Sequence, residues 1–315
     1  ARRGDHGFQP ASTFGTRLVH AIAVGTLDHQ RMTTERRQRF RQQRRVRGTE
    51  ITREDHPPGP SLRCRDAALD VDRTEDMSCA AQTNLELGLL GATEGDVIIR
   101  AAREIRAGRH HEHFLVDMIQ GGAGTSTNMN ANEVIANRAL ELLNQPRGQY
   151  DVISPNSHVN LSQSTNDVYP TAVRVALHQS LSVFRAELGR LADAFDAKGT
   201  EFASMLKMGR TQMQDAVPMT LGQEFKAFAH TLREDVDRMA EAQSLIREIN
   251  LGATAIGTGI NAPPGYAELV ARTLAVISEV PVITAPDLIE ATSDTGGFVQ
   301  LSGVLKRTST KLSKI

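Results

Sequence analysis

The sequence has 315 residues, of which 40% are hydrophobic and 23% are charged, and its formal net charge at pH 7 is -1. This length and composition predict a soluble globular protein with a sizeable core and about two or three domains. The near-zero charge gives no general attraction to nucleic acid or to an anionic membrane, and no apolar run approaches the roughly 20 residues of a membrane-spanning helix. We therefore expect neither of these partners.

Residues 1–78 are unlike the rest of the chain. Arginine is dense over residues 31–47, periodic hydrophobic residues are few, and three prolines over residues 57–60 interrupt any helix. We interpret this segment as solvated or disordered and unrelated to the domains that follow. An arm that binds nucleic acid, which the scarcity of aromatic residues disfavours, and a stretch of non-native coding sequence are the alternatives.

The two cysteines, Cys64 and Cys79, do not stand in a CxxC or Cys/His pattern, so neither a disulfide framework nor a zinc site is expected. The apolar stretch over residues 18–27 has polar interruptions and no clear cleavage signature. Both observations favour a cytoplasmic location.

Helix-favouring sequence begins near Met77. Two short helices are predicted at 80–90 and 97–105, and a third at 131–143. Between the second and third helices lie His110, His111 and His113, whose spacing lacks a supporting carboxylate pattern, so a solvent-facing turn is favoured over a metal site. We expect no metal and no cofactor.

Three polar clusters each precede sequence that reads as helical. They lie at residues 120–130, where glycines run into hydroxyl and amide side chains, at 163–166 and at 209–212. Glycine allows a close approach of the backbone to a ligand, and the N–H groups at a helix start bind anions. The repeated pattern predicts a site for a small carboxylate that needs no metal.

Hydrophobic residues spaced four and three apart in alternation over residues 177–195, and three, four or seven apart over 225–249, predict two long helices, each with an apolar seam along one side. Such seams are typical of a helical bundle whose apolar faces contact several neighbours, so we expect an oligomer. Further helices are predicted over 266–277 and 298–315. The seam positions are Leu177, Leu181, Phe184, Leu188, Leu191 and Phe195, and then Phe225, Phe228, Leu232, Val236, Met239, Ile246 and Ile249.

Four segments resemble the motifs of the aspartase/fumarase superfamily and occur in the same order as in that family. Their residues are more similar to those of the aspartases. The resemblance runs from about Cys79 to Ile315. It implies an all-α fold, with a long-helix bundle of the aspartase/fumarase type and a smaller N-terminal helical domain, assembled as a homotetramer whose active sites combine several subunits. The segments are 121–133 (GGAGTSTNMNANE), 158–167 (HVNLSQSTND), 209–218 (GRTQMQDAVP) and 252–259 (GATAIGTG).

On this basis we divide the chain into the atypical segment 1–78, a partial N-terminal lyase domain over 79–165 and a truncated helix-bundle domain over 166–315. The resemblance implies reversible anti elimination of ammonia from L-aspartate to give fumarate, so a small dicarboxylate or amino acid is the expected ligand. Removing the proton beside a carboxylate builds negative charge on that carboxylate as an aci-form intermediate. Hydroxyl and N–H donors at helix starts suit the stabilisation of that charge.

By resemblance, Thr125, Ser164 and Thr165 would hold the carboxylate next to the reacting carbon. Asn166 would orient the departing amino group, and Thr211 would contact the other carboxylate. Helix capping is the structural alternative for the first three residues, and capping can coexist with binding.

Gln212 bears on the choice of activity. Fumarate hydratases and several aspartases have His after the corresponding Gly-Arg-Thr, whereas some aspartases have Gln. A Gln cannot exchange a proton near neutral pH, so Gln212 would position substrate, and it argues against the hydratase. Asp215 is a weaker candidate for a general base.

The family's catalytic base is a serine on a Gly-Ser-Ser-x-Met-Pro-x-Lys-x-Asn loop, and this sequence contains no such motif. We therefore name no catalytic residue and expect an incomplete chain that is inactive alone. A fumarate hydratase of class II type and a non-catalytic assembly subunit are the alternative interpretations.

Overall fold

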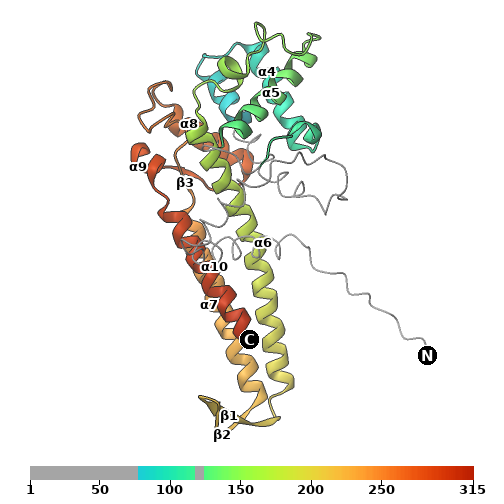
Figure 1. The fold of residues 1–315 in the computed structure, drawn as a ribbon, viewed down its shortest axis with the longest axis vertical. Helices are drawn as coiled ribbons and strands as arrows, with labels where there is room; N and C mark the ends of the chain where they lie inside the picture. Colours follow the sequence, from blue (N-terminus) through green and yellow to red (C-terminus); the bar gives the residue numbers. More distant parts are fainter. Residues whose placement is uncertain (1–76, 118–123) are drawn as a thin grey trace, which may run out of the picture. The chain divides into compact units, whose positions relative to one another are not determined.

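The computed structural model describes residues 77–117 and 124–315 (Figure 1). Most of the segment 1–78 and the glycines at 121–122 therefore lie outside the described residues. Within those ranges, no helix is both long enough and apolar enough to cross a membrane.

Helices make up most of the described chain, which confirms the all-α prediction. Residues 77–86 are helical. After them come α4 (Ala92–Arg106), the 3₁₀ turn η1 (His111–His113), α5 (Thr125–Leu142), the π-helical turn η2 (Pro155–Val159), α6 (Thr165–Glu201), α7 (Leu221–Leu245), α8 (Tyr266–Ser278), α9 (Leu288–Ser293) and α10 (Gly296–Lys314).

Two small sheets accompany the helices. Strands β1 (Leu206–Thr211) and β2 (Gln214–Thr220) form an antiparallel hairpin between α6 and α7. Strands β3 (Glu248–Ile249) and β4 (Ile283–Thr284) pair in parallel. The predicted seam over 225–249 therefore ends in a strand, because α7 stops at Leu245 while the buried Ile249 belongs to β3.

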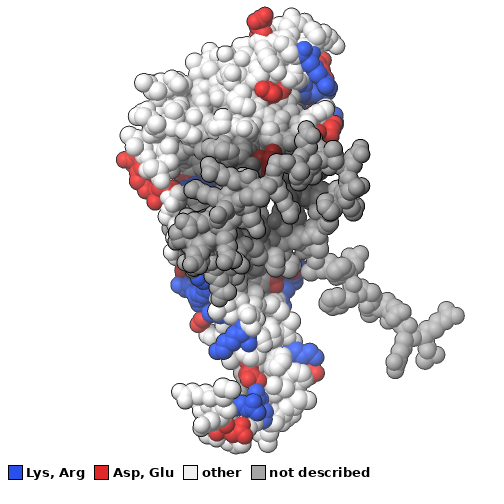
Figure 2. Space-filling model, in the orientation of Figure 1, with Lys and Arg blue, Asp and Glu red and all other residues white. Residues whose placement is uncertain are grey.

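The described residues form two compact units, and α6, α7 and α10 each contribute to both. The bundle unit comprises 183–239 and 300–315, and the larger unit comprises 77–117, 124–182 and 240–299. The domain boundaries drawn from the sequence stay predictions. On the face drawn in Figure 2, basic and acidic side chains lie close together at several places.

The core of the bundle unit lies between α6 and α7. Leu188 and Ala192 of α6 and Leu232 of α7 are buried there. Leu191, which the seam pattern places inside, is 39% exposed. A straight α-helix has 3.6 residues per turn, so a stripe with a 3.5-residue repeat drifts around it, and Ala192 occupies the buried position instead. The packed neighbours are Phe184, Phe195, Val236 and Leu312.

An ion-pair group ties α10 to α7 inside the bundle unit. The carboxylate of Asp235 is fully buried and lies 2.8 Å from Lys311 Nζ and 3.1 Å from Arg307 Nη2. A buried charge requires such partners, because losing them leaves it desolvated and unpaired. The C-terminal helix is therefore fixed by charge as well as by Leu312.

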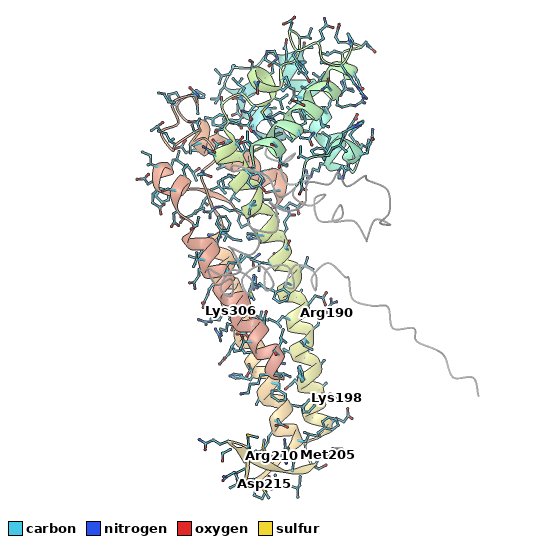
Figure 3. All side chains as sticks on the ribbon, in the orientation of Figure 1. Arg190, Lys198, Met205, Arg210, Asp215 and Lys306 are labelled. Carbon is cyan, nitrogen blue, oxygen red and sulfur yellow. The ribbon has the colours of Figure 1, made fainter. Side chains whose placement is uncertain are left out.

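The hairpin corrects one expectation about the third polar cluster. Residues 209–212 do not lead directly into a helix, because they form the end of β1 and its turn, and α7 begins only at Leu221. Gln212 and Met213 both have positive φ, 51° and 78°, as a two-residue hairpin turn requires. Figure 3 shows Arg210 and Asp215 on the two strands, where they form an exposed ion pair of 3.3 Å.

The core of the larger unit joins the predicted short helices to α8. Ile98 of α4, Ile135 and Leu140 of α5 and Leu274 of α8 are all fully buried in one hydrophobic cluster. This core positions the starts of α5 and α6, where the first two polar clusters lie.

A close helix contact in the bundle unit is testable. A Cβ on Gly222 of α7 would lie 2.4 Å from the Gly199 carbonyl oxygen of α6, so Gly222→Ala should lower the free energy of unfolding by about 1–3 kcal/mol. Gly189 of α6 has no neighbour within 4 Å of such a Cβ. The control Gly189→Ala should raise the free energy of unfolding by about 0.5–1 kcal/mol, because alanine loses less backbone entropy in a helix. Urea denaturation followed by circular dichroism measures both. Equal effects would contradict the contact.

Candidate functional site

The candidate site lies at the starts of α5 and α6 in the larger unit. We call Thr125, Ser164, Thr165 and Asn166 the helix-start cluster. Helix α5 begins at Thr125, directly after Gly124, whose φ is +87°. A Cβ on that glycine would lie 2.3 Å from the ring of Tyr169 in α6, so only glycine lets the start of α5 approach α6 this closely.

The carboxylate of Asp167 accepts a hydrogen bond at the start of α6. The Ser164 N–H donates to Asp167 Oδ1 at 2.8 Å, and Ser164 Oγ accepts from the Asn166 N–H at 3.3 Å. This pattern is a variant of the capping box, because the Asp167 side chain at N3 satisfies the Ser164 N–H while Ser164 Oγ accepts from N2 rather than from N3.

Asparagines of α5 connect the two helix starts. Asn128 Nδ2 donates to Thr165 Oγ1 at 3.0 Å and to Asn160 Oδ1 at 3.2 Å. Asn132 Nδ2 reaches the same Asn160 oxygen at 3.1 Å. The structure therefore joins the first and second polar clusters through one buried amide. Asn128 and Asn132 stand inside the first motif, but their spacing along the chain does not reveal these contacts, which join two helices.

Asp167 also holds the glycine-rich loop of the fourth motif. Its Oδ2 atom accepts from the N–H groups of Thr254 at 2.8 Å and Gly252 at 3.2 Å, and the residue is fully buried. Burial raises the pKa of the Asp167 carboxyl to about 7, while the N–H donors of Ser164, Thr254 and Gly252 oppose that rise. Sequence reasoning missed this residue, whose only signal was its place at the end of the second motif.

The fourth motif lies next to Asn166 as well. Asn166 Nδ2 donates to the Ala255 carbonyl oxygen at 2.7 Å, and the Asn166 carbonyl oxygen accepts from Asn250 Nδ2 at 3.0 Å. Three of the four motifs thus meet in the larger unit.

The helix-start cluster is accessible to a ligand. Thr125 and Asn166 are exposed, and Ser164 and Thr165 are half-buried. Each helix start also presents backbone N–H groups and the positive end of a helix dipole. The arrangement can bind a small anion with hydroxyl, amide and N–H donors.

Thr211 and Gln212 belong to the bundle unit. Both are exposed, Thr211 at the end of β1 and Gln212 in the turn that follows. Their assignment to the same site as the helix-start cluster stays a prediction that depends on the family resemblance.

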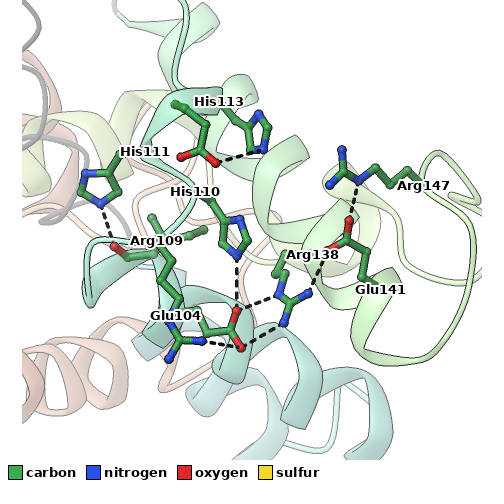
Figure 4. Close-up of polar contacts among 10 residues, drawn as sticks. Glu104, Arg109, His110, His111, His113, Arg138, Glu141 and Arg147 are labelled. Carbon is green, nitrogen blue, oxygen red and sulfur yellow. Dashed lines mark hydrogen bonds and ion pairs between the residues drawn. The ribbon is translucent and has the colours of Figure 1, made fainter.

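A second polar group, the Arg138 network, lies elsewhere in the larger unit (Figure 4). Arg138 of α5 contacts Glu104 of α4 at 2.7 and 3.2 Å and Glu141 at 2.8 Å. Arg147 contacts Glu141 at 2.5 Å. The pKa values of the Glu104 and Glu141 carboxyl groups lie below their usual range, mainly because each group accepts a hydrogen bond from Arg138. The same bonds raise the pKa of Arg138.

Comparison with known proteins places the chain in a family. The family described as lyase matches residues 28–315, a range that begins inside the segment 1–78. An aspartate ammonia-lyase of Pseudomonas aeruginosa is 59% identical over 237 residues, which are 75% of this chain and 50% of the relative. An aspartate ammonia-lyase of Escherichia coli is 49% identical over the same shares.

Solved structures agree with these sequence matches. A fumarate lyase described as delta crystallin from Brucella melitensis, bound to cobalt, has a TM-score of 0.79 and 52% identity, covering 83% of this chain and 56% of its own. A class II fumarase from Schistosoma mansoni has a TM-score of 0.74 and 32% identity, covering 81% and 57%. The chain therefore belongs to the lyase family, within the aspartase/fumarase superfamily. It spans about half the length of the curated relatives that it matches.

The role of Asp167 can be tested with Asp167→Asn. At pH 8, above the pKa of about 7, the carboxylate accepts from three backbone N–H groups, and an amide nitrogen would face at least one of them. The variant should lose about 1–3 kcal/mol of unfolding free energy, because a buried donor loses its acceptor. Asp193→Asn, at an exposed pair with Arg233, is the control and should change stability by less than about 0.5 kcal/mol. If both variants were equally stable, Asp167 would not hold the loop.

The Arg138 network gives a prediction about pH. Because the folded-state pKa of Glu141 is lowered from 4.5, its stabilising contribution is present above that pH and is lost as the pH falls through the lower folded value. Glu141→Gln should cost about 1–2 kcal/mol at pH 7, and this difference from the wild type should shrink below pH 4.5. Denaturation curves across pH measure it. Glu201→Gln, at an exposed pair with Lys198, should show little difference at any pH. A pH-independent loss in Glu141→Gln would contradict the ionic cause.

Proposed function

We propose that this chain is part of an aspartate ammonia-lyase, which eliminates ammonia reversibly from L-aspartate to give fumarate. The observation that carries the proposal is the joining of the α5 and α6 starts by the Asn128–Thr165 hydrogen bond, which gathers hydroxyl and amide groups where the family binds a carboxylate. Identities of 49–59% with aspartate ammonia-lyases support the same activity. A cytoplasmic homotetramer is part of this proposal.

The hydroxyl groups are arranged as donors. Thr165 Oγ1 already accepts from Asn128, and Ser164 Oγ already accepts from the Asn166 N–H. Each hydroxyl therefore has its own proton left to donate, and a substrate carboxylate is a suitable acceptor. Thr125 adds a third hydroxyl at the first residue of α5.

These donors address the difficult step of the reaction. Proton abstraction beside a carboxylate places extra negative charge on its oxygens, and donors that are already in position stabilise that charge without further reorganisation. Removing one donor of this kind in other enzymes costs about 2.7–4 kcal/mol of transition-state stabilisation. Ser164, Thr165 and Thr125 would therefore supply a substantial part of the lowering of the barrier.

Asn166 fits a different role. One N–H of its amide is used on the Ala255 carbonyl, so its Oδ1 atom is the group best suited to accept from an ammonium. This supports its assignment to the departing amino group.

Thr211 and Gln212 would complete the site from the bundle unit. Thr211 would contact the second carboxylate, and Gln212 would position substrate without exchanging a proton. The family builds this site from several subunits, so these residues would serve a neighbouring copy. We assign no residue of this sequence to proton abstraction, because the serine loop motif does not occur in it.

A fumarate hydratase is the second candidate. The likeness to a class II fumarase, with a TM-score of 0.74, favours it. The identity is only 32%, and Gln212 stands where the hydratases have His. A non-catalytic assembly subunit is the remaining alternative.

The activity can be tested with a chimera in which this chain is continued with the remainder of the Pseudomonas aeruginosa relative, which supplies the serine loop. Ultraviolet absorbance should show fumarate formed from L-aspartate and none from malate. Turnover of malate without turnover of aspartate would favour the hydratase. A folded tetramer that converts neither substrate would favour the assembly subunit.

In the same chimera, Thr165→Val should lower kcat by about 10²–10³-fold, because a donor to the developing charge is removed while the side-chain shape is kept. Thr200→Val, an exposed position of the same helix whose hydroxyl donates to the Asp196 carbonyl, is the control and should leave kcat within about twofold of the parent. An equal effect of the two substitutions on kcat would contradict the role of Thr165.

A further inference from the structure

Two histidines are brought together by the η1 turn. A 3₁₀ turn has three residues per turn, so positions i and i+3 lie on the same side. The His113 N–H donates to the His110 carbonyl at 3.1 Å, and the two imidazole rings are nearly parallel, at 14°, with centroids 6.2 Å apart. Both side chains line one pocket of about 200 Å³. His111, by contrast, is bonded through Nε2 to the Ile105 carbonyl at 2.8 Å.

A carboxylate completes this group. Glu112 lies between the histidines in sequence, and one potential ligand atom from each of Glu112, His110 and His113 lies within 4.8 Å of the others. Zinc bonds to nitrogen and carboxylate oxygen are about 2.0–2.2 Å long, so ligand atoms around one ion stand roughly 3–4 Å apart. His113 Nε2 and Glu112 Oε1 lie 3.6 Å apart, and these side chains are 44% and 69% exposed, which leaves them room to turn toward an ion.

The orientation of His110 is already set. Its Nε2 atom lies 3.3 Å from Glu104 Oε2, and Glu104 is itself held by two bonds from Arg138 (Figure 4). Metal-ligating histidines usually donate their second ring N–H to a carboxylate in this way, which fixes the tautomer and makes the ligand nitrogen more basic. A proton on Nε2 leaves Nδ1 of His110 as the metal ligand. Spacing alone did not show this supporting carboxylate, because it comes from α4.

We propose that His110, Glu112 and His113 bind a divalent transition-metal cation of the zinc class. Two imidazoles and one carboxylate suit zinc, nickel or copper, whereas magnesium and calcium prefer oxygen ligands. Glu104 is neutralised by Arg138 and by Arg109 at 3.7 Å, so Glu112 is the anionic ligand. Glu112 is 69% exposed, so water can reach the group and complete the coordination. The proposal does not depend on the proposed lyase activity.

Calorimetric titration of the full chain with zinc chloride tests the site. His110→Asn keeps a residue that tolerates the left-handed backbone at φ 64°, and His113→Gln changes a partly exposed side chain. Each should weaken zinc binding at least tenfold. His230→Gln, at an exposed position of α7, is the matched control and should leave zinc affinity within about twofold. Unchanged affinity in His110→Asn and His113→Gln would overturn the proposal.

A second experiment tests the orientation of His110. In nitrogen-15 spectra of the histidine rings, zinc should shift Nδ1 of His110 while Nε2 keeps its proton. Glu104→Gln should weaken zinc binding about 10–100-fold, with circular dichroism confirming that the variant is folded. Zinc binding through Nε2 of His110, or unchanged affinity in folded Glu104→Gln, would contradict the orienting role of Glu104.

Discussion

The buried carboxylate of Asp167 is the interaction on which the candidate site depends. One of its oxygens accepts from the Ser164 N–H at the start of α6, and the other accepts from Gly252 and Thr254. Buried N–H groups need acceptors, so a single side chain satisfies the helix start and the glycine-rich loop together. That loop in turn holds the Asn166 amide. The position of a proposed substrate-binding group therefore derives from a residue that we do not assign to substrate.

Local periodicity predicted the long helices well, because spacings of three and four report which side of a helix is apolar. It could not predict where the second helix ends, because Ile249 continues the hydrophobic pattern but is buried as part of strand β3. The β1–β2 hairpin was also missed. Its β-branched residues and Pro218 disfavour a helix, but the pairing of Leu206 with Thr220 is a contact between distant positions.

The candidate site was predictable only in part for the same reason. Its motifs and the start of α6 could be read from the sequence. The bond from Asn128 to Thr165 depends on how closely α5 approaches α6, which Gly124 permits against Tyr169. The contact that orients His110 beside the η1 turn likewise comes from another helix, because Glu104 belongs to α4. Spacing along the chain reports neighbours within an element, whereas these contacts join elements whose packing the pattern does not specify.

The sequence left helix capping open as the structural alternative for the hydroxyls, and the structure shows how much capping they do. Helix α5 has Gly124 at its N-cap, with no side-chain cap bond, and the N–H that precedes α6 is satisfied by Asp167. Thr165 accepts from Asn128, an amide that has Asn160 as a second acceptor. Capping therefore accounts for only the 3.3 Å bond to Ser164 Oγ. The buried side chains of Asp167 and Asn128 make the contacts that hold the helix starts and the loop in place. The accessible hydroxyls are therefore not required for those contacts and remain available to a ligand.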